Sequence, residues 1–173
     1  MLKTSFKISL ACAVTAFFAA CSTPTVSSDD AESPYSLKRE EISSSSVSLK
    51  SIYEAVEESG LYTTKDSVAA YLCKFDKLPS NYITQNEGKA LYESKTGNTF
   101  SKWNFNPWTT LDVMIGGDSF GNKEGLLPKG SYHEADVDYS AKNRGTKRLV
   151  YEGDCVIYYT ADHYKSFSKL EVR

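Results

Sequence analysis

The chain has 173 residues and a formal net charge of −2, so it is not one of the strongly basic proteins that coat nucleic acids without specificity. Its charge is unevenly placed: residues 61–173 hold 15 Lys and Arg against 14 Asp and Glu, whereas residues 21–60 are acidic. Once an N-terminal segment is set aside, about 120 residues remain, which suffices for one domain with a single core. Because the charges of residues 61–173 nearly balance, any contact of this domain with nucleic acid must be local.

The N-terminus predicts export. Residues 1–20 combine two early lysines with a nearly uninterrupted apolar run, which is too short to persist as a membrane-spanning helix and is typical of a signal peptide. The run ends Phe18-Ala19-Ala20-Cys21 and resembles a bacterial lipobox, which implies lipidation at Cys21. An ordinary cleavage site is the alternative. We therefore expect a lipoprotein held at the outer membrane or cell surface only through its lipid, or a protein released outside the cell.

Residues 21–50 are rich in serine and acidic side chains and predict a disordered tether, since they offer too little apolar surface to offset their ordering entropy. The folded domain is expected over residues 51–173. Of the four cysteines, Cys12 leaves with the signal and Cys21 carries the lipid, so Cys73 and Cys155 remain in the domain. An oxidising compartment allows these two to form one disulfide. Two separate buried thiols are the alternative.

Helices are predicted in the first half of the domain. Ile52, Ala55 and Val56 share one helical face, and Gly60 is expected to end that helix. Apolar residues at helical spacing over 68–75 predict a second helix, which Pro79 stops. The segment Thr84-Gln85-Asn86-Glu87 is a capping-box pattern and opens a third helix through about Leu91. Residues 95–110 are irregular, with room for one helical turn.

Strands are predicted in the second half. Gly116-Gly117 indicates a turn or a bulge. Residues 133–139 alternate, with Ala135 and Val137 on one face and Glu134 on the other. Residues 148–151 and 155–160 form two strands around a tight turn, and 168–173 form the last. The fold class is therefore α+β, with the N-terminal helices on one face of a C-terminal antiparallel sheet. The other face, which carries Glu134, can hold a site.

The two histidines differ in context. His133 shares the Ala135 face, is expected to turn toward the helices, and suits a structural role. His163 lies in a loop between two strands, from which it can reach over the sheet. Arg144 and Arg148 flank the entry to a strand, and their planar guanidinium groups suit phosphate oxygens. Lys142 and Lys147 in the same run are expected to be solvated.

A carboxylate, an imidazole and two arginines on one sheet face are sufficient for metal-free RNA cleavage. The carboxylate accepts the proton of a ribose 2′-OH, the imidazolium protonates the departing 5′-oxygen, and the guanidinium groups stabilise the phosphoryl charge. The sequence has no acidic cluster with the spacing of a magnesium site, and we expect neither a metal nor a cofactor.

The domain strongly resembles barnase and binase, a family of secreted bacterial guanyl-preferring ribonucleases. The resemblance spans about residues 61–173 and is in order throughout. The segments that carry it are Tyr71-Leu72, Lys77-Leu78-Pro79, Asn81-Tyr82-Ile83-Thr84, Ile115-Gly116-Gly117-Asp118, Phe120, Asn122, Glu124-Gly125, Leu127-Pro128, Glu134-Ala135-Asp136, Tyr139, Arg144, Arg148, Tyr151, Asp162-His163-Tyr164 and Phe167.

The resemblance implies the microbial ribonuclease fold and a role for each candidate residue. Glu134 would be the general base, His163 the general acid, and Arg144 and Arg148 the ligands of the scissile phosphate. The guanine-binding loop would consist of Phe120, Gly121, Asn122, Lys123 and Glu124, with Tyr164 lining the base and phosphate site. The implied partners are single-stranded RNA and a barstar-like acidic inhibitor, and we expect a monomer.

Five features depart from the family. Gln85 stands where the family has a lysine that supports the phosphate, and Lys123 stands where it usually has an arginine. The stretch between Leu91 and Ile115 is longer, and the loop between Pro128 and Glu134 is shorter. Cys73 and Cys155 are additions, on elements that pack together in that fold. The alternative to an active enzyme is therefore a weakened RNA- or nucleotide-binding lipoprotein of the same fold.

Overall fold

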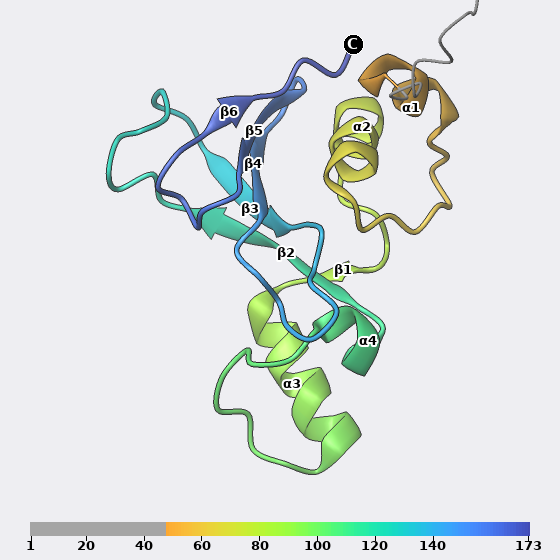
Figure 1. Ribbon diagram of the computed structural model, residues 1–173, viewed down its shortest axis with the longest axis vertical. Helices are drawn as coiled ribbons and strands as arrows, with labels where there is room; N and C mark the ends of the chain where they lie inside the picture. Colours follow the sequence, from red (N-terminus) through yellow and green to blue (C-terminus); the bar gives the residue numbers. More distant parts are fainter. Residues whose placement is uncertain (1–47) are drawn as a thin grey trace, which may run out of the picture. The chain divides into compact units, whose positions relative to one another are not determined.

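The computed structural model describes residues 48–173 (Figure 1). The predicted signal peptide, the lipidation site at Cys21 and most of the predicted tether lie outside the described residues. No helix within residues 48–173 is both long enough and apolar enough to cross a membrane.

The helices begin and end at local sequence signals. Ser48 caps α1 (Leu49–Ala55) and Thr64 caps α2 (Lys65–Phe75), each by accepting a hydrogen bond from a backbone N–H of the first turn. The predicted end of this helix at Gly60 is wrong. α1 ends earlier, at Val56, where the chain turns to an extended conformation.

The predicted capping box opens α3 (Gln85–Thr96), with Thr84 and Glu87 each bonding the other's backbone. α3 runs past the predicted end at Leu91 because the first residue that favours a stop is Gly97, which takes a left-handed conformation with φ +69°. The single helical turn expected within residues 95–110 corresponds to α4 (Pro107–Leu111), which has a proline in its first turn.

The six strands within residues 48–173 lie side by side in chain order. They are β1 (Tyr82–Ile83), β2 (Met114–Phe120), β3 (Tyr132–Asp136), β4 (Arg148–Glu152), β5 (Val156–Thr160) and β6 (Ser168–Lys169). β2 to β6 form an antiparallel meander, in which β3 to β6 correspond to the predicted strands. β2, where the sequence showed only a turn or bulge signal, and β1, which pairs with β2 in parallel, were not predicted as strands. The order of helices and strands confirms the α+β class.

Gly116 and Gly117 lie inside β2, where the register against β3 shifts between Gly116 and Asp118. Gly117 has a φ of +92°, so the glycine pair produces a bulge, one of the two predicted outcomes. β6 is shorter than the predicted strand over 168–173, although Val172 beyond it is buried.

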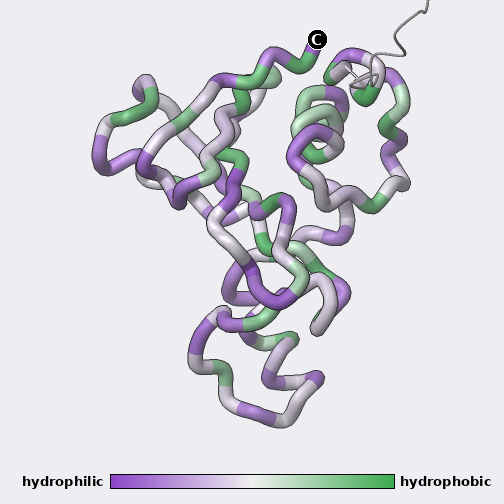
Figure 2. Tube along the Cα trace, in the orientation of Figure 1, coloured by the Kyte–Doolittle hydropathy of each residue, from purple (hydrophilic) through white to green (hydrophobic). Residues whose placement is uncertain are grey.

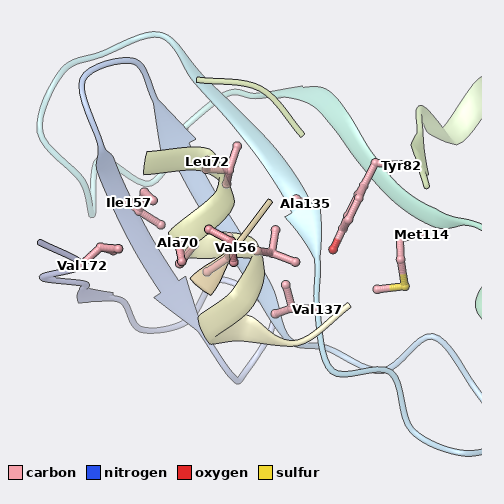
Figure 3. Packing of buried hydrophobic residues seen from close by; sticks show 12 residues of the cluster. Val56, Ala70, Leu72, Tyr82, Met114, Ala135, Val137, Ile157 and Val172 are labelled. Carbon is pink, nitrogen blue, oxygen red and sulfur yellow. The ribbon is translucent and has the colours of Figure 1, made fainter. Parts of the chain in front are cut away.

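The main core lies between α2 and one face of the sheet (Figure 3). Ala70 and Leu72 of α2 meet Ala135 of β3 and Ile157 of β5, and all four side chains are buried. Figure 2 shows hydrophobic residues recurring along α2 and the central strands. Burying each large aliphatic side chain contributes about 1.5–3 kcal/mol.

The predicted disulfide is present. Cys73, in the last turn of α2, is bonded to Cys155, which precedes β5, across a Cα–Cα distance of 4.3 Å. The bond ties the covering helix to the sheet and excludes the alternative of two separate thiols.

The opposite face of the sheet carries a smaller apolar cluster. Leu127, Tyr132 and Val150 are buried there, and Phe120 and Tyr164 pack against them. This cluster supports two of the segments that the sequence assigns to the site.

Candidate active site

Glu134 lies on β3, on the face opposite α2, because side chains alternate along a strand and its neighbour Ala135 belongs to the main core. Its half-buried carboxylate has a different partner on each oxygen. The Tyr164 hydroxyl donates to Oε2 at 2.5 Å, and the Gln85 side-chain amide donates to Oε1 at 3.3 Å. These contacts join the sheet, the start of α3 and the loop after β5 at one point.

Tyr164 holds its proton in this arrangement. Burial, followed by the hydrogen bond and the charge of Glu134, raises the pKa of Tyr164 well above its ordinary value. The phenol therefore remains a donor, and its hydrogen bond orients the Glu134 carboxylate.

The loop that carries His163 is built on Asp162. One carboxylate oxygen accepts from the Thr160 hydroxyl and from the backbone N–H groups of Lys165 and Ser166, and the other accepts from the Ser166 hydroxyl. The hydrogen bonds from the side chain and backbone of Ser166, with those from Thr160 and Lys165, lower the pKa of Asp162 to about 2.

His163 itself is exposed, and its ring lies 4.6 Å from the Tyr164 ring, centroid to centroid. His163 and Tyr164 have φ values of +58° and +71°. Consecutive left-handed residues are unfavourable for side chains other than glycine. The Asp162 hydrogen bonds offset that cost, so the loop is held in a conformation that leaves the imidazole accessible.

A surface hollow of about 550 Å³ adjoins His163. It brings together the whole predicted guanine-binding loop and the segment after β5. The residues that line it are Phe120, Gly121, Asn122, Lys123, Glu124, Leu126, His163, Tyr164 and Lys165.

Asn122 holds the loop that forms one wall of this hollow. Its side chain donates to the carbonyl of Leu127 and accepts from the backbone N–H of the same residue. Asn122 also has a φ of +40°, and asparagine adopts this left-handed region more readily than most residues. The loop therefore has a defined shape before any ligand binds.

The two arginines converge on Asp136, which sequence reasoning did not single out. Arg144 donates to Asp136 Oδ2 through Nε and to Oδ1 through Nη2 at 2.9 Å, and Arg148 Nε lies 2.6 Å from Oδ1. The Asp136 and Arg148 side chains are 1% and 3% exposed. Arg148 also donates to the carbonyls of Lys147 and Gly145. Two cations around one carboxylate leave a net charge of +1, which suits a phosphate group.

The alternation of β3 could have identified Asp136, since it shares a face with Glu134. The structure thus brings Glu134, Gln85 and Tyr164 into contact and pairs both arginines through one buried carboxylate.

Gln85 is held at the start of α3, where its backbone N–H donates to Asp118 of β2 at 2.8 Å. Lys142 and Lys147 are exposed, as expected.

His133 differs from its expected position. It lies on the strand face that α2 covers farther along, but its side chain is exposed, with Nδ1 3.1 Å from the Gly117 carbonyl oxygen. Strand alternation alone therefore gave the wrong burial for His133.

A larger hollow, of about 820 Å³, lies beside the start of α2 and is lined in part by Thr64, Trp108 and Lys147. It contains none of the predicted site residues. Among residues 48–173, no group of three or more His, Cys, Asp or Glu side chains is placed to hold a metal ion.

Residues 65–171 match the family described as ribonuclease. The chain therefore belongs to the ribonuclease family, whose members cleave RNA, and the match confirms the resemblance in the sequence to the barnase and binase type. A ribonuclease of Heyndrickxia coagulans is 42% identical over 110 residues, which cover 62% of this chain and 95% of that protein.

Two further relatives match less of their own length. A ribonuclease of Bacillus intermedius is 42% identical over 110 residues, and the match spans 64% of that protein and 62% of this chain. Guanyl-specific ribonuclease St of Saccharopolyspora erythraea is 44% identical over 55 residues, which cover 30% of this chain and 54% of that protein.

One solved structure, ribonuclease Sa2 with guanosine-2′-cyclophosphate, is 26% identical. The match covers 53% of this chain and 89% of that chain, with a TM-score of 0.31.

Proposed function

We propose that the protein is a guanyl-preferring endoribonuclease that cleaves single-stranded RNA by transphosphorylation, without a metal. The observation that carries this proposal is the hydrogen bond that Glu134 accepts from Tyr164, because Tyr164 lines the hollow together with His163 and the loop over 120–124. A base, an acid and a pocket for a nucleobase thus adjoin one another.

In the proposed reaction Glu134 takes the proton of the ribose 2′-OH. The 2′-oxygen forms a bond to the adjacent phosphorus, and the bond from phosphorus to the 5′-oxygen breaks. His163, protonated, gives its proton to that oxygen, so the products are a 2′,3′-cyclic phosphate and a free 5′-hydroxyl. Arg144 and Arg148 stabilise the charge that grows on the phosphoryl oxygens. Each role has a residue of this chain, so the scheme requires no metal.

Guanine would occupy the hollow of about 550 Å³. Backbone N–H groups of the loop over 120–124 would meet O6 of the base, and the Glu124 carboxylate would accept from the hydrogens on N1 and N2. The two carboxylate oxygens match two donors that adenine does not present together. Phe120 and Tyr164, whose ring centroids are 5.2 Å apart, form the apolar floor beneath.

Cleavage of a short RNA that contains one guanosine, in the presence of EDTA, tests the proposal. We expect a single cut after guanosine and a terminal 2′,3′-cyclic phosphate, identified by mass spectrometry. Glu134→Gln is the matched control, because it keeps the shape of the side chain and removes its basicity. An RNA that is bound but left intact would favour the weakened RNA-binding protein instead.

The site is proposed to act outside the cytoplasm, since the disulfide is of the kind that persists in oxidising compartments. Lipidation at Cys21 would hold it at a membrane. An acidic, barstar-like inhibitor would protect the producing cell by covering the arginines.

A further inference from the structure

The segment between α3 and α4, residues 97–106, carries an aromatic cluster that the proposed mechanism does not use. Phe100, Trp103 and Phe105 pack on one another and on Tyr92 of α3, with ring centroids 4.7–5.8 Å apart. All four side chains are partly exposed. Figure 1 shows this segment looping beside α3.

Trp103 packs closely against α3 because Gly88 has no side chain. A Cβ atom at Gly88 would lie 2.9 Å from Cη2 of Trp103 and 2.7 Å from Cδ1 of Ile115, both closer than real contacts allow. Gly88 lies one turn along α3 from Gln85, whose side chain contacts Glu134. Trp103 is therefore held next to the candidate active site.

The indole ring of Trp103 also meets one of the two predicted phosphate ligands. Cζ of Arg144 lies 5.4 Å from the ring centroid, within the range of a cation–π contact, for which tryptophan is the best partner. Asp136 already holds Nε and Nη2 of the same guanidinium, which leaves Nη1 for a ligand. One edge of the group is thus fixed by a carboxylate and its face by an aromatic ring.

We propose that Trp103 is a positioning residue for Arg144, an inference that rests on the proposed function. The carboxylate of Asp136 determines which edge of the guanidinium is used, and the indole determines the plane of the group, so that Nη1 is directed at the phosphate. Trp103 Nε1 is buried and has no hydrogen-bond partner among the described residues. The ring face, and not the N–H group, performs this role.

The test compares Trp103→Leu with Trp103→Phe, which keeps an aromatic face, and with Trp108→Leu as a matched control from the other hollow. Two inhibitors separate the effects: guanosine needs only the base pocket, whereas guanosine 3′-monophosphate also needs the arginines. We expect Trp103→Leu to weaken binding of guanosine 3′-monophosphate about fivefold. We expect it also to lower kcat on a guanosine-containing dinucleotide about fivefold, as the loss of one cation–π contact implies. Binding of guanosine should not change.

Trp103→Phe should recover most of both losses, and Trp108→Leu should behave as wild type. If Trp103→Leu weakened the binding of guanosine and of its monophosphate equally, the proposal would be overturned, because the variant would then have damaged the whole site. Unchanged binding of the monophosphate would overturn it as well. If the wild-type protein cleaves no RNA, the proposed function fails instead, and the comparison of the two inhibitors still tests the contact with Arg144.

A second measurement does not require Trp103 to be replaced. The chain has two tryptophans, so Trp108→Phe leaves Trp103 as the only one. We expect its fluorescence to change on titration with inorganic phosphate, because the cation over the ring gains an anionic partner. An emission that does not respond, at phosphate concentrations that inhibit cleavage, would overturn the proposal.

Discussion

The side-chain amide of Gln85 donates a hydrogen bond to the carboxylate of Glu134 across 3.3 Å. The contact joins the first residue of α3 to the third residue of β3. It places a neutral donor beside the proposed general base, at the position where the family carries a lysine.

Gln85→Lys should raise kcat by about tenfold, which corresponds to about 1.4 kcal/mol of transition-state stabilisation. A lysine adds a positive charge where phosphoryl charge grows, and a charge-assisted hydrogen bond is roughly twice as strong as a neutral one. Steady-state kinetics on a guanosine-containing dinucleotide measures the effect. Gln85→Met, which has a similar length and no donor, should lower kcat.

A different cation could already fill this role, and Lys89 is the nearest along α3. The structure places Lys89 Nζ over the Phe100 ring, 5.9 Å from its centroid. We therefore expect no compensation from it. An unchanged or lower kcat for a normally folded Gln85→Lys variant would contradict this prediction.

Replacing His163 by alanine should abolish most of the turnover while leaving guanosine binding intact, since general acid catalysis contributes about 10²–10⁴-fold. Activity should also fall at both ends of the pH range, because the reaction needs Glu134 ionised and His163 protonated. His133→Ala, which removes the other histidine, is the control. Turnover that survives in His163→Ala would refute the assignment.

Glu124→Gln should erode the preference for guanine. The ionised carboxylate accepts two hydrogen bonds, whereas an amide offers one acceptor and one mismatched donor. Mapping the cuts on an RNA of mixed sequence measures the preference, and Glu152→Gln, on β4, is the control. Cuts that remain enriched after guanosine as in wild type would show that another group reads the base.

Asp162→Asn should loosen the loop that presents His163 and lower kcat. The pKa of Asp162 in the folded protein is about 2, below the reference of about 3.9 for aspartate. Its contribution to loop stability is therefore complete above about pH 3.9 and is lost as the pH falls toward 2.

Hydrogen exchange at the amides of Lys165 and Ser166, which donate to this carboxylate, reports the effect. At neutral pH both amides should exchange faster in Asp162→Asn than in wild type, and the difference should shrink in acid. Asp154→Asn, in the turn before β5, is the matched control. Equal exchange in wild type and Asp162→Asn at neutral pH would mean that the carboxylate does not hold the loop.

Loss of the disulfide should lower the free energy of unfolding by about 4 kcal/mol, the chain-entropy estimate for a loop of this length. The two cysteines are 82 residues apart in the sequence. Urea unfolding of wild type and of the double variant Cys73→Ser with Cys155→Ser measures the difference. Two free thiols by mass spectrometry in the exported protein would remove the basis of this prediction.

Much of the fold could be predicted because the signals that produce it are local. Thr84 and Glu87 cap each other within one turn, and the alternation over 133–139 assigns Glu134 to the face opposite the core. Such contacts join residues a few positions apart, so a pattern in the chain is enough to predict them. The ordered family resemblance added the predicted guanine-binding loop, and the structure places all five of its residues around one hollow.

Contacts between distant residues were decided only by the tertiary structure. β1 pairs in parallel with β2 across 30 residues of intervening helix and loop, and no local signal marks so short a strand. The partners of the charged side chains are likewise decided only in the folded chain. Asp136 neutralises part of the charge of Arg144 and Arg148, and Trp103 reaches Arg144 from a separate segment. The sequence by itself determined which side chains could carry the chemistry. Only the packing of α3, the sheet and the loops decided how each is oriented, because orientation depends on neighbours that the chain brings together when it folds.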